Sequence, residues 1–202
     1  MNEKGILLIV CGPSGVGKTS LSHELLERHD RLQFSVSYTT RDRREHEVDG
    51  EDYHFVDTET FEEMRDEGAF AEWAEVHGSL YGTPKRAIRE AWRHDRDLLF
   101  DIDFQGARQL NRSFDEATGI LVIPPDMETL EDRLRGRGSE TSQSLDRRLS
   151  EARHELAQYD LFDYAVCNDD FDHAARTLSG IYLACRHKMT FHRERIEKLV
   201  NE

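Results

Sequence analysis

One segment near the start of the chain constrains the fold more than any other. An apolar run, Ile6 to Val10, precedes GPSGVGKT, Gly12 to Thr19, which fits the pattern Gly-x4-Gly-Lys-Ser/Thr. Glycines let such a loop wrap a phosphate with backbone N–H groups, and the helix after it adds its dipole. In this pattern Lys18 reaches the β- and γ-phosphates and Thr19 ligates Mg²⁺. A glycine-rich turn that binds nothing is the alternative, which the full spacing between strand and helix disfavours.

The rest of the chain alternates between apolar runs and amphipathic segments. We expect strands at residues 6–10, 34–37, 69–76, 98–103, 120–123 and 164–167, and helices at 18–29, 58–67, 84–94, 126–135, 144–158 and from 170 onward. Strands that alternate with helices predict an α/β fold of the P-loop NTPase type, with a mostly parallel sheet and helices on both faces. The strand-rich region 37–83 breaks the alternation and is the expected insert.

Composition limits the classes of partner. The 202 residues carry a net charge of -14, which argues against nonspecific nucleic-acid binding and against an anionic membrane surface. The three cysteines are widely spaced, which favours a reducing compartment over a disulfide framework. The apolar run before Cys11 is too short for a signal sequence or a membrane span. We therefore expect a cytoplasmic protein that binds neither nucleic acid nor membrane.

Two acids close the predicted strand 98–103. Asp101 follows an apolar run, and in a P-loop protein an acid at this place is expected to hold Mg²⁺ through water. Asp103 lies two residues on, and hence on the same face if the strand continues that far. An ordinary acid at the end of a strand is the alternative. Asp103 and Gly106 also imitate the Asp-x-x-Gly signal of GTPases, but the Asn-Lys-x-Asp motif that specifies guanine there is absent.

A cluster of arginines stands out in this acidic chain. The stretch SVSYTTRDRREHEVDGEDYHF, Ser35 to Phe55, contains Arg41, Arg43 and Arg44. The planar fork of arginine suits phosphate oxygens, so a tight cluster suggests that an anion binds there. A solvated basic turn is the alternative.

Taken in order, several stretches resemble the guanylate kinase family. They cover roughly residues 5 to 185 and read ILLIVCGPSGVGKTSL, SVSYTTR, EVDGEDYHFV, FAEWAEVHGSLYGT, DIDFQGARQL, RLRGRGSET with RRLSEA, and VCNDDF. The loop alone is shared by many families, whereas the ordered set is specific. The resemblance implies one kinase domain, 1–202, that phosphorylates GMP and dGMP with ATP as co-substrate and Mg²⁺ as cofactor. Its implied parts are a core (1–36, 84–133 and 157–202), a GMP-binding insert (37–83) and a lid (134–156).

The resemblance also implies roles for individual residues. The phosphate of GMP would be bound by Arg41, Arg44, Tyr53 and Tyr81, and the base by Ser37, Glu72, Thr83 and Asp103. A carboxylate can accept from the N1–H and the 2-amino group of guanine, whereas it repels the N1 acceptor of adenine. For Glu72 the alternative is an ordinary solvent-facing acid on a strand.

The ATP side is implied in the same way. ATP would be bound by Gly12, Pro13, Ser14, Gly15, Val16, Gly17, Lys18, Thr19, Ser20 and Asn168, the last of them near the adenine. The catalytic group would be Lys18 with the lid arginines Arg133, Arg137 and Arg148, and the metal would be held by Thr19 and Asp101.

The arginine loop departs from the family pattern, and this keeps alternatives open. Arg43 stands where the family commonly has Pro, and His46 where it has Gly, so the aim of Arg44 is in doubt and Arg43 can substitute for it. A non-glycine residue at 46 also predicts strain if the turn needs a positive φ. A related kinase for another phosphorylated metabolite therefore remains an alternative, as does an inactive binding module, although intact Lys18 and Thr19 disfavour the module.

The sequence leaves the oligomeric state undecided. In the C-terminal tail, 186–202, four apolar residues can dock on the core or on another subunit: Met189, Ile196, Leu199 and Val200.

Overall fold

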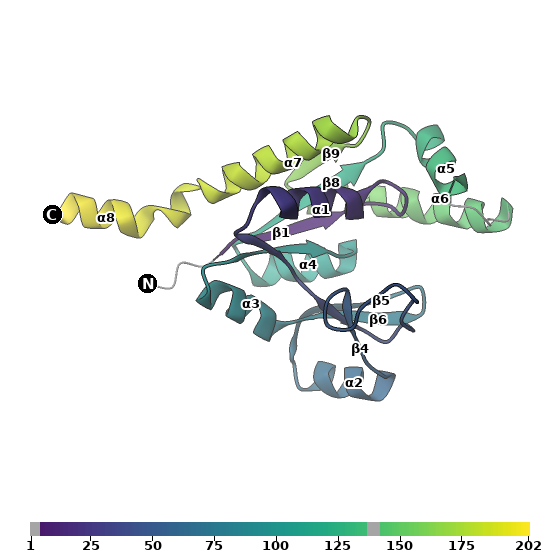
Figure 1. Ribbon diagram of the computed structural model, residues 1–202, viewed down its shortest axis with the longest axis horizontal. Coiled ribbons are helices and arrows are strands. Elements are labelled where there is room, and N and C mark those ends of the chain that lie inside the picture. The colour runs from purple at the N-terminus through teal and green to yellow at the C-terminus, as the bar shows by residue number, and fades with distance from the viewer. Residues whose placement is uncertain (1–4, 137–141) are drawn as a thin grey trace.

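A five-stranded parallel sheet forms the core of the computed structural model, which describes residues 5–136 and 142–202 (Figure 1). Its strand order is β2-β7-β1-β8-β9, with β1 in the centre. The strands are β1 (Leu7–Cys11), β2 (Leu32–Phe34), β7 (Asp97–Asp101), β8 (Ala117–Ile123) and β9 (Tyr164–Cys167). The central strand pairs in parallel with β7 and β8, which places the loop after β1 beside the end of β7.

Helices cover both faces of this sheet because β1 is apolar on both sides. Side chains alternate between the faces of a strand. Leu8 and Val10 pack with α1 (Lys18–Arg28) and α7 (Phe171–Arg186). Leu7 and Ile9 pack with α3 (Lys85–Arg93) and α4 (Phe104–Ser113). In Figure 1, α7 lies above the core strands and α4 below them. The prediction of an α/β core with helices on both faces is confirmed.

A second sheet is built from residues 37–84. Its strands are β3 (Ser37–Thr39), β4 (Tyr53–Phe55), β5 (Phe70–Val76) and β6 (Ser79–Pro84), in the order β4-β3-β6-β5. The β3–β4 pair is parallel and the other pairs are antiparallel. Helix α2 (Thr58–Asp66) closes one face, because Phe61 stacks on Phe70 with ring centroids 4.5 Å apart. This unit lies below the core in Figure 1 and is called the insert from here on; the division into core, insert and lid stays a prediction.

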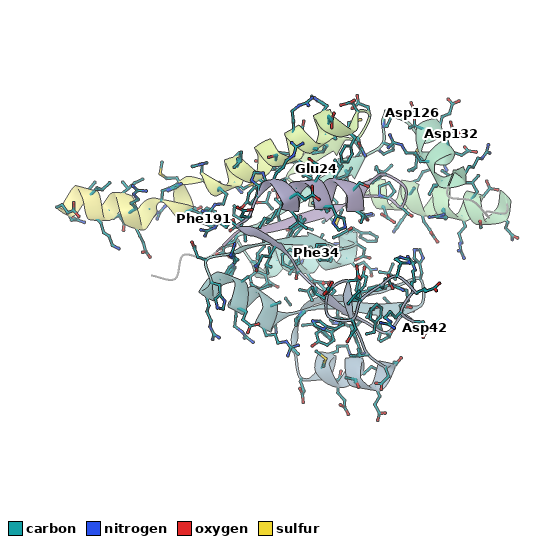
Figure 2. All side chains as sticks on the ribbon, viewed as in Figure 1. Glu24, Phe34, Asp42, Asp126, Asp132 and Phe191 are labelled. Atoms are coloured by element: carbon teal, nitrogen blue, oxygen red, sulfur yellow. The ribbon has the colours of Figure 1, made fainter. Side chains whose placement is uncertain are left out.

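Two helices extend the core at the end that carries the phosphate loop. They are α5 (Met127–Arg135) and α6 (Ser142–Leu156), followed by the short 3-10 helix η1 (Tyr159–Leu161). Leu145, Leu149 and Ala152 of α6 pack into the same core cluster as α1. In Figure 2, Asp126 and Asp132 mark α5 at this end of the molecule.

The C-terminal tail leaves the core. It forms the 3-10 helix η2 (Met189–Phe191) and α8 (Arg193–Asn201), and α8 projects from the body of the protein (Figure 1). Phe191 packs against the core, while every residue of α8 is exposed. Docking on the core therefore stops at Phe191. Within the described part of the chain, no helix is both long and apolar enough to cross a membrane.

Some predicted element boundaries were wrong. The strand expected at 34–37 is two strands in different sheets, because the chain crosses from core to insert at Ser35 and Val36. The strand expected to reach Asp103 ends at Asp101. The helix expected to open at Thr83–Pro84 begins at Lys85.

Candidate active site

The phosphate loop has a positive φ, which favours glycine, at Gly12, Gly15 and Gly17. Gly12 has a φ of 144° and Gly17 a φ of 99°. A Cβ at Gly12 would lie 2.3 Å from the Val122 carbonyl oxygen, and one at Gly17 would lie 2.4 Å from Asn168 Nδ2. Both the conformation and the close contacts therefore exclude a side chain. The loop is shaped by its neighbours before any nucleotide binds.

Lys18 is the first residue of α1 and lies near the C-terminal end of this loop. Its Nζ donates to the Gly12 carbonyl oxygen at 2.5 Å, which folds the side chain back over the loop. Asn168 holds the loop from the other side, because its Nδ2 donates to the Val16 carbonyl oxygen at 2.8 Å. Arg133 extends this link by donating to the backbone oxygen of Asn168 at 2.9 Å. Nη1 of Arg133 is buried and has no hydrogen-bond partner among the described residues.

The two predicted acids occupy different elements. Asp101 ends β7, opposite Val10 of β1, and burial raises the pKa of its carboxyl group while Lys18 opposes the rise. Asp103 is the N-cap of α4, where its Oδ1 accepts from Gln105 N at 3.1 Å and Gly106 N at 3.0 Å. They therefore do not share a strand face, and Asp103 has a capping role that sequence reasoning did not assign.

The oxygens at this place suit a hard cation. Mg²⁺ in nucleotide sites is held by one or two protein oxygens together with phosphates and waters. The half-buried carboxylate of Asp101 and the exposed hydroxyl of Thr19 are oxygens of this type, so these residues fit the cofactor. No cluster of three His, Cys, Asp or Glu side chains that could hold a metal was found among residues 5–136 and 142–202.

A cavity of about 260 Å³ lies between the phosphate loop and the insert. Four parts of the chain line it: the loop (Gly12, Ser14, Lys18), the end of β7 (Asp101, Ile102, Asp103), the insert (Ser37, Tyr53, Glu72, Ala74, Val76, His77, Tyr81) and α6 (Glu155). Residues far apart in the sequence thus line one cavity.

Three buried side chains form a chain of hydrogen bonds on the insert side. Thr83 Oγ1 donates to Glu72 Oε1 at 2.6 Å, and Ser37 Oγ lies 3.1 Å from Thr83 Oγ1. Glu72 is only 3% exposed, so the alternative of a solvent-facing strand acid is wrong. Burial raises the pKa of Glu72 to about 7, while the bond from Thr83 acts in the opposite direction. A buried acid whose pKa is raised, and which lies beside two hydroxyls, is typical of a ligand-binding group.

A second group surrounds Arg41. Its guanidinium donates to both oxygens of Glu47, with Nη2–Oε1 at 2.8 Å and Nη1–Oε2 at 3.1 Å, and its Cζ lies 5.5 Å from the ring centroid of Tyr53. The rings of Tyr53 and Tyr81 are 5.9 Å apart. Burial raises the pKa of Tyr53 to about 12, so its hydroxyl stays a donor. The guanidinium of Arg41 and the two phenol rings therefore lie close together.

The side chains of the loop that follows Arg41 are more exposed than that of Arg41. Arg43, Arg44 and His46 are exposed, and the neighbouring Asp42 lies at the margin of the insert (Figure 2). Arg44 is anchored through its backbone, whose N–H donates to Glu47 Oε2 at 2.8 Å. Among the described residues the non-glycine positions with positive φ are His77 and Asp95. The expected strain at His46 is therefore wrong for this conformation.

The lid side contributes Arg148. Its Nη2 donates to Ser14 Oγ in the phosphate loop at 2.8 Å, so α6 contacts the loop directly. Arg137 lies outside the described residues. The rest of the predicted ATP-binding set is continuous along the loop and the first turn of α1: Pro13 and Val16 are buried, Gly15 has a φ of 88°, and Thr19 and Ser20 are exposed.

Comparison with known proteins decides the family. The sequence model described as guanylate kinase matches residues 4–184. The guanylate kinase of Oleidesulfovibrio alaskensis is 46% identical over 200 residues, which cover 99% of this chain and 97% of the relative. The chain belongs to the guanylate kinase family. It is accordingly a nucleotide-binding phosphotransferase with guanylate kinase activity.

Two further comparisons agree. The guanylate kinase of Nitratidesulfovibrio vulgaris is 49% identical over 181 residues, covering 90% of this chain and 87% of the relative. The crystal structure of guanylate kinase from Anaplasma phagocytophilum superposes with a TM-score of 0.76 at 32% identity, covering 91% of this chain and 87% of the other.

Two carboxylates in this guanylate kinase were given no role from the sequence. Glu47 binds Arg41, and that bond lowers the pKa of its carboxyl group. Glu155 lines the cavity from α6, where burial raises its pKa to about 7, with Lys18 acting against the rise and Asp103 with it. The position of Glu47 in the arginine loop was a possible signal for its role. Nothing in the helical pattern around Glu155 distinguishes it from a surface acid.

Proposed function

We propose that the cavity between the phosphate loop and the insert is where the γ-phosphoryl group of ATP passes to GMP or dGMP, giving ADP and GDP or dGDP. One observation carries the proposal. The cavity is lined at one end by Lys18 of the phosphate loop and at the other by Glu72 and Ser37, the buried polar groups that suit guanine.

On the acceptor side, the base would lie against Glu72. A carboxylate there accepts from the guanine N1–H and 2-amino groups, and the hydroxyls of Ser37 and Thr83 supply a donor for O6. Adenine places an acceptor at N1, so the same carboxylate repels it. The α-phosphate of GMP would be bound by Arg41 with the phenols of Tyr53 and Tyr81, whose rings already lie close together. Arg44 would add a further charge if the loop brings its side chain inward.

On the donor side, the loop N–H groups and Lys18 would bind the ATP phosphates. Thr19 and Asp101 would hold Mg²⁺, which neutralises charge on the phosphates when bound. Lys18 would leave the Gly12 carbonyl oxygen for the transferring group. The buried, unpaired Nη1 of Arg133 and the contact of Arg148 with Ser14 support a role for both cations at the same phosphates. Arg137 would act with them, and Asn168 would lie near the adenine.

The transfer itself needs positioning and charge neutralisation, with no covalent intermediate on the protein. Arginines from α5 and α6 would neutralise the charge that develops on the transferred group, and closure over it would exclude water and so limit ATP hydrolysis.

A coupled assay of ADP formation with ATP, Mg²⁺ and a panel of monophosphates tests the proposal. GMP and dGMP should be phosphorylated, and AMP, UMP and CMP should be poor acceptors. A strong preference for another phosphorylated metabolite would favour the related-kinase alternative, for which the departures at Arg43 and His46 are the motive. Absence of transfer to every acceptor would favour the inactive binding module.

The cellular setting is proposed on separate grounds. All three cysteines are free and two of them, Cys11 and Cys185, are buried, which is compatible with a cytoplasmic enzyme. The proposed partners are the small molecules ATP and GMP, without nucleic acid or membrane.

A further inference from the structure

The open edge of the insert sheet is held by glutamines of the core. Strand β5 is the edge strand of its sheet. Oε1 of Gln109, on α4, accepts from Trp73 N at 3.2 Å, and its Nε2 donates to Trp73 O at 2.6 Å. One side-chain amide thus makes both bonds that a neighbouring strand would make at that residue. Trp73 follows Glu72 in the sequence, so Gln109 fixes the backbone beside the carboxylate that faces the cavity.

Gln105, one turn earlier on α4, makes a second connection. Its Nε2 donates to the backbone oxygen of Glu75 on β5 at 3.3 Å and to Asp103 Oδ2 at 2.8 Å. The same side chain therefore contacts the strand that carries Glu72 and the carboxylate of Asp103. The positions of Glu72 and Asp103, the two acids assigned to guanine, therefore both depend on contacts with the first turns of α4.

Gly106 provides the space for this arrangement. A Cβ at Gly106 would lie 2.5 Å from Glu72 Oε2 and 3.1 Å from its Cδ. The glycine does not have a positive φ, and glycine is a poor helix former, so its backbone conformation does not explain its presence in the first turn of α4. The absence of a side chain at Gly106 leaves room for the Glu72 carboxylate near the N-terminus of α4, where the helix dipole is positive.

We propose that α4 positions the guanine-recognising carboxylate, with Gly106 determining where Glu72 Oε2 lies and Gln109 holding the adjacent backbone. The inference rests on the proposed role of Glu72 in base recognition. Glu72 belongs to the insert, which joins the core through two crossings of the chain, at 35–36 and 84–85. The contacts from α4 fix the distance between Glu72 and Asp103 across that junction.

The test compares Gly106→Ala with Gly180→Ala as the matched control. Gly180 lies within helix α7, and a Cβ there would meet no atom within 4 Å among the described residues. Gly106→Ala should raise KM for GMP about tenfold or more, because a misplacement of about 1 Å in a binding group has effects of this order or larger. The value of kcat and the KM for ATP should stay close to those of the parent.

Specificity gives a readout that a purely structural role would not move. Inosine monophosphate lacks the 2-amino group of guanine. The preference for GMP over it therefore measures how well the Glu72 carboxylate is placed to accept from that group. This preference should fall in Gly106→Ala and in Gln109→Met, and should be unchanged in Gly180→Ala. An unchanged preference in both test variants, or equal losses for the two acceptors, would overturn the proposal.

A shorter acid provides the rescue. Glu72→Asp withdraws the carboxylate from α4, so its cost in kcat/KM for GMP should be smaller in the Gly106→Ala background than in the parent. Strictly additive losses would show that the two residues do not act on one another.

Thermal unfolding without nucleotide separates the positioning role from the proposed function. It is measured on the parent, Gly106→Ala, Glu72→Asp and the double variant. Non-additive midpoints show the contact between Gly106 and Glu72 whatever the substrate is, and additive ones refute it. If the parent fails to phosphorylate GMP while this coupling is present, the proposed function is wrong and the packing relation stands. If the parent is active and the coupling is absent, the positioning role is wrong.

Discussion

The two ends of the cavity are built by different means. At the phosphate loop the proposed binding groups belong to the backbone, and glycines at 12 and 17 hold a path that no other residue can follow. At the insert they belong to side chains: Glu72 is held by Thr83 and faces α4, and Arg41 is held by Glu47. A backbone site is fixed by local sequence. A side-chain site depends on partners that the sequence places far away.

The difference predicts how each end responds to substitution. At the loop, loss of one side chain removes a charge from a framework that stays in place. At the insert, loss of one side chain leaves a buried partner unsatisfied, so binding and stability change together.

The largest effect is expected for Lys18→Ala. Lys18 is the cation of the loop, and removal of one group that stabilises developing charge costs about 10²–10³ in kcat. The loop itself should persist because Val16 stays bonded to Asn168. GMP binding, measured by calorimetry, should be close to that of the parent, while GMP-dependent ADP formation nearly disappears. Transfer at the parent rate would show that this loop does not act in catalysis.

Glu72→Gln should have the next largest effect. One acceptor oxygen becomes an amide that faces a donor on guanine, and a charge-assisted bond is lost. The expected loss in kcat/KM for GMP is roughly 2–4 kcal/mol, on the scale of a buried unpaired polar group plus a charged hydrogen bond. Discrimination against AMP should shrink, because the carboxylate that repels adenine N1 is gone. Kinetics with GMP and AMP on one purified variant check both parts, and unchanged GMP efficiency would mean that Glu72 does not read the base.

The same acid makes the acceptor end dependent on pH. Burial raises the pKa of Glu72 to about 7, and guanine needs the ionised form. KM for GMP should therefore rise as the pH falls below about 7, by up to about tenfold per unit. The phosphate of GMP also titrates, near pH 6. Glu72→Gln should retain only that phosphate titration, whereas Glu155→Gln should keep the Glu72 limb in KM; loss of the limb in Glu155→Gln instead would assign it to Glu155.

The free energy of unfolding should change with pH in the opposite direction to GMP binding. Because the folded pKa of Glu72 lies above the unfolded value of about 4.3, its protonated form favours the fold. This contribution is complete below the unfolded pKa and is lost as the pH rises through about 7. The unfolding midpoint of nucleotide-free protein should fall less between pH 5 and pH 8 in Glu72→Gln than in the parent. An equal fall in both proteins would show that Glu72 is not buried as described.

What the sequence could predict follows the same division. The strand, loop and helix around Lys18 are contiguous and could be predicted from spacing alone. Glu72 required resemblance to a family, since its strand pattern fits a solvent-facing acid equally well. Glu155 and Gln109 were missed because their roles depend on contacts with the loop and with Trp73, which no local pattern encodes. The split of residues 34–37 between two sheets was missed for the same reason.

Among the arginines, Arg41→Ala should be more damaging than Arg43→Ala. Arg41 is pre-oriented by Glu47 and contacts Tyr53, so it acts without further ordering of the loop. Its loss should raise KM for GMP by about tenfold or more, the scale of a charged hydrogen bond. Arg44→Ala should also raise KM sharply if its side chain turns inward with substrate. An indifferent Arg44→Ala beside a damaging Arg43→Ala would show that Arg43 binds the phosphate instead.

The smallest effect is expected when the family residues are restored, as Arg43→Pro together with His46→Gly. The structure gives no strain at His46 to relieve, because its φ is not positive. Proline would reduce the freedom of the unfolded loop by about 0.4–1 kcal/mol, provided that its conformation suits the ring. KM for GMP should stay the same or fall slightly, because this gain acts on folding stability and not on acceptor binding. Steady-state kinetics at fixed ATP measure this change, and a higher KM would mean that the exposed arginine contributes to binding the acceptor.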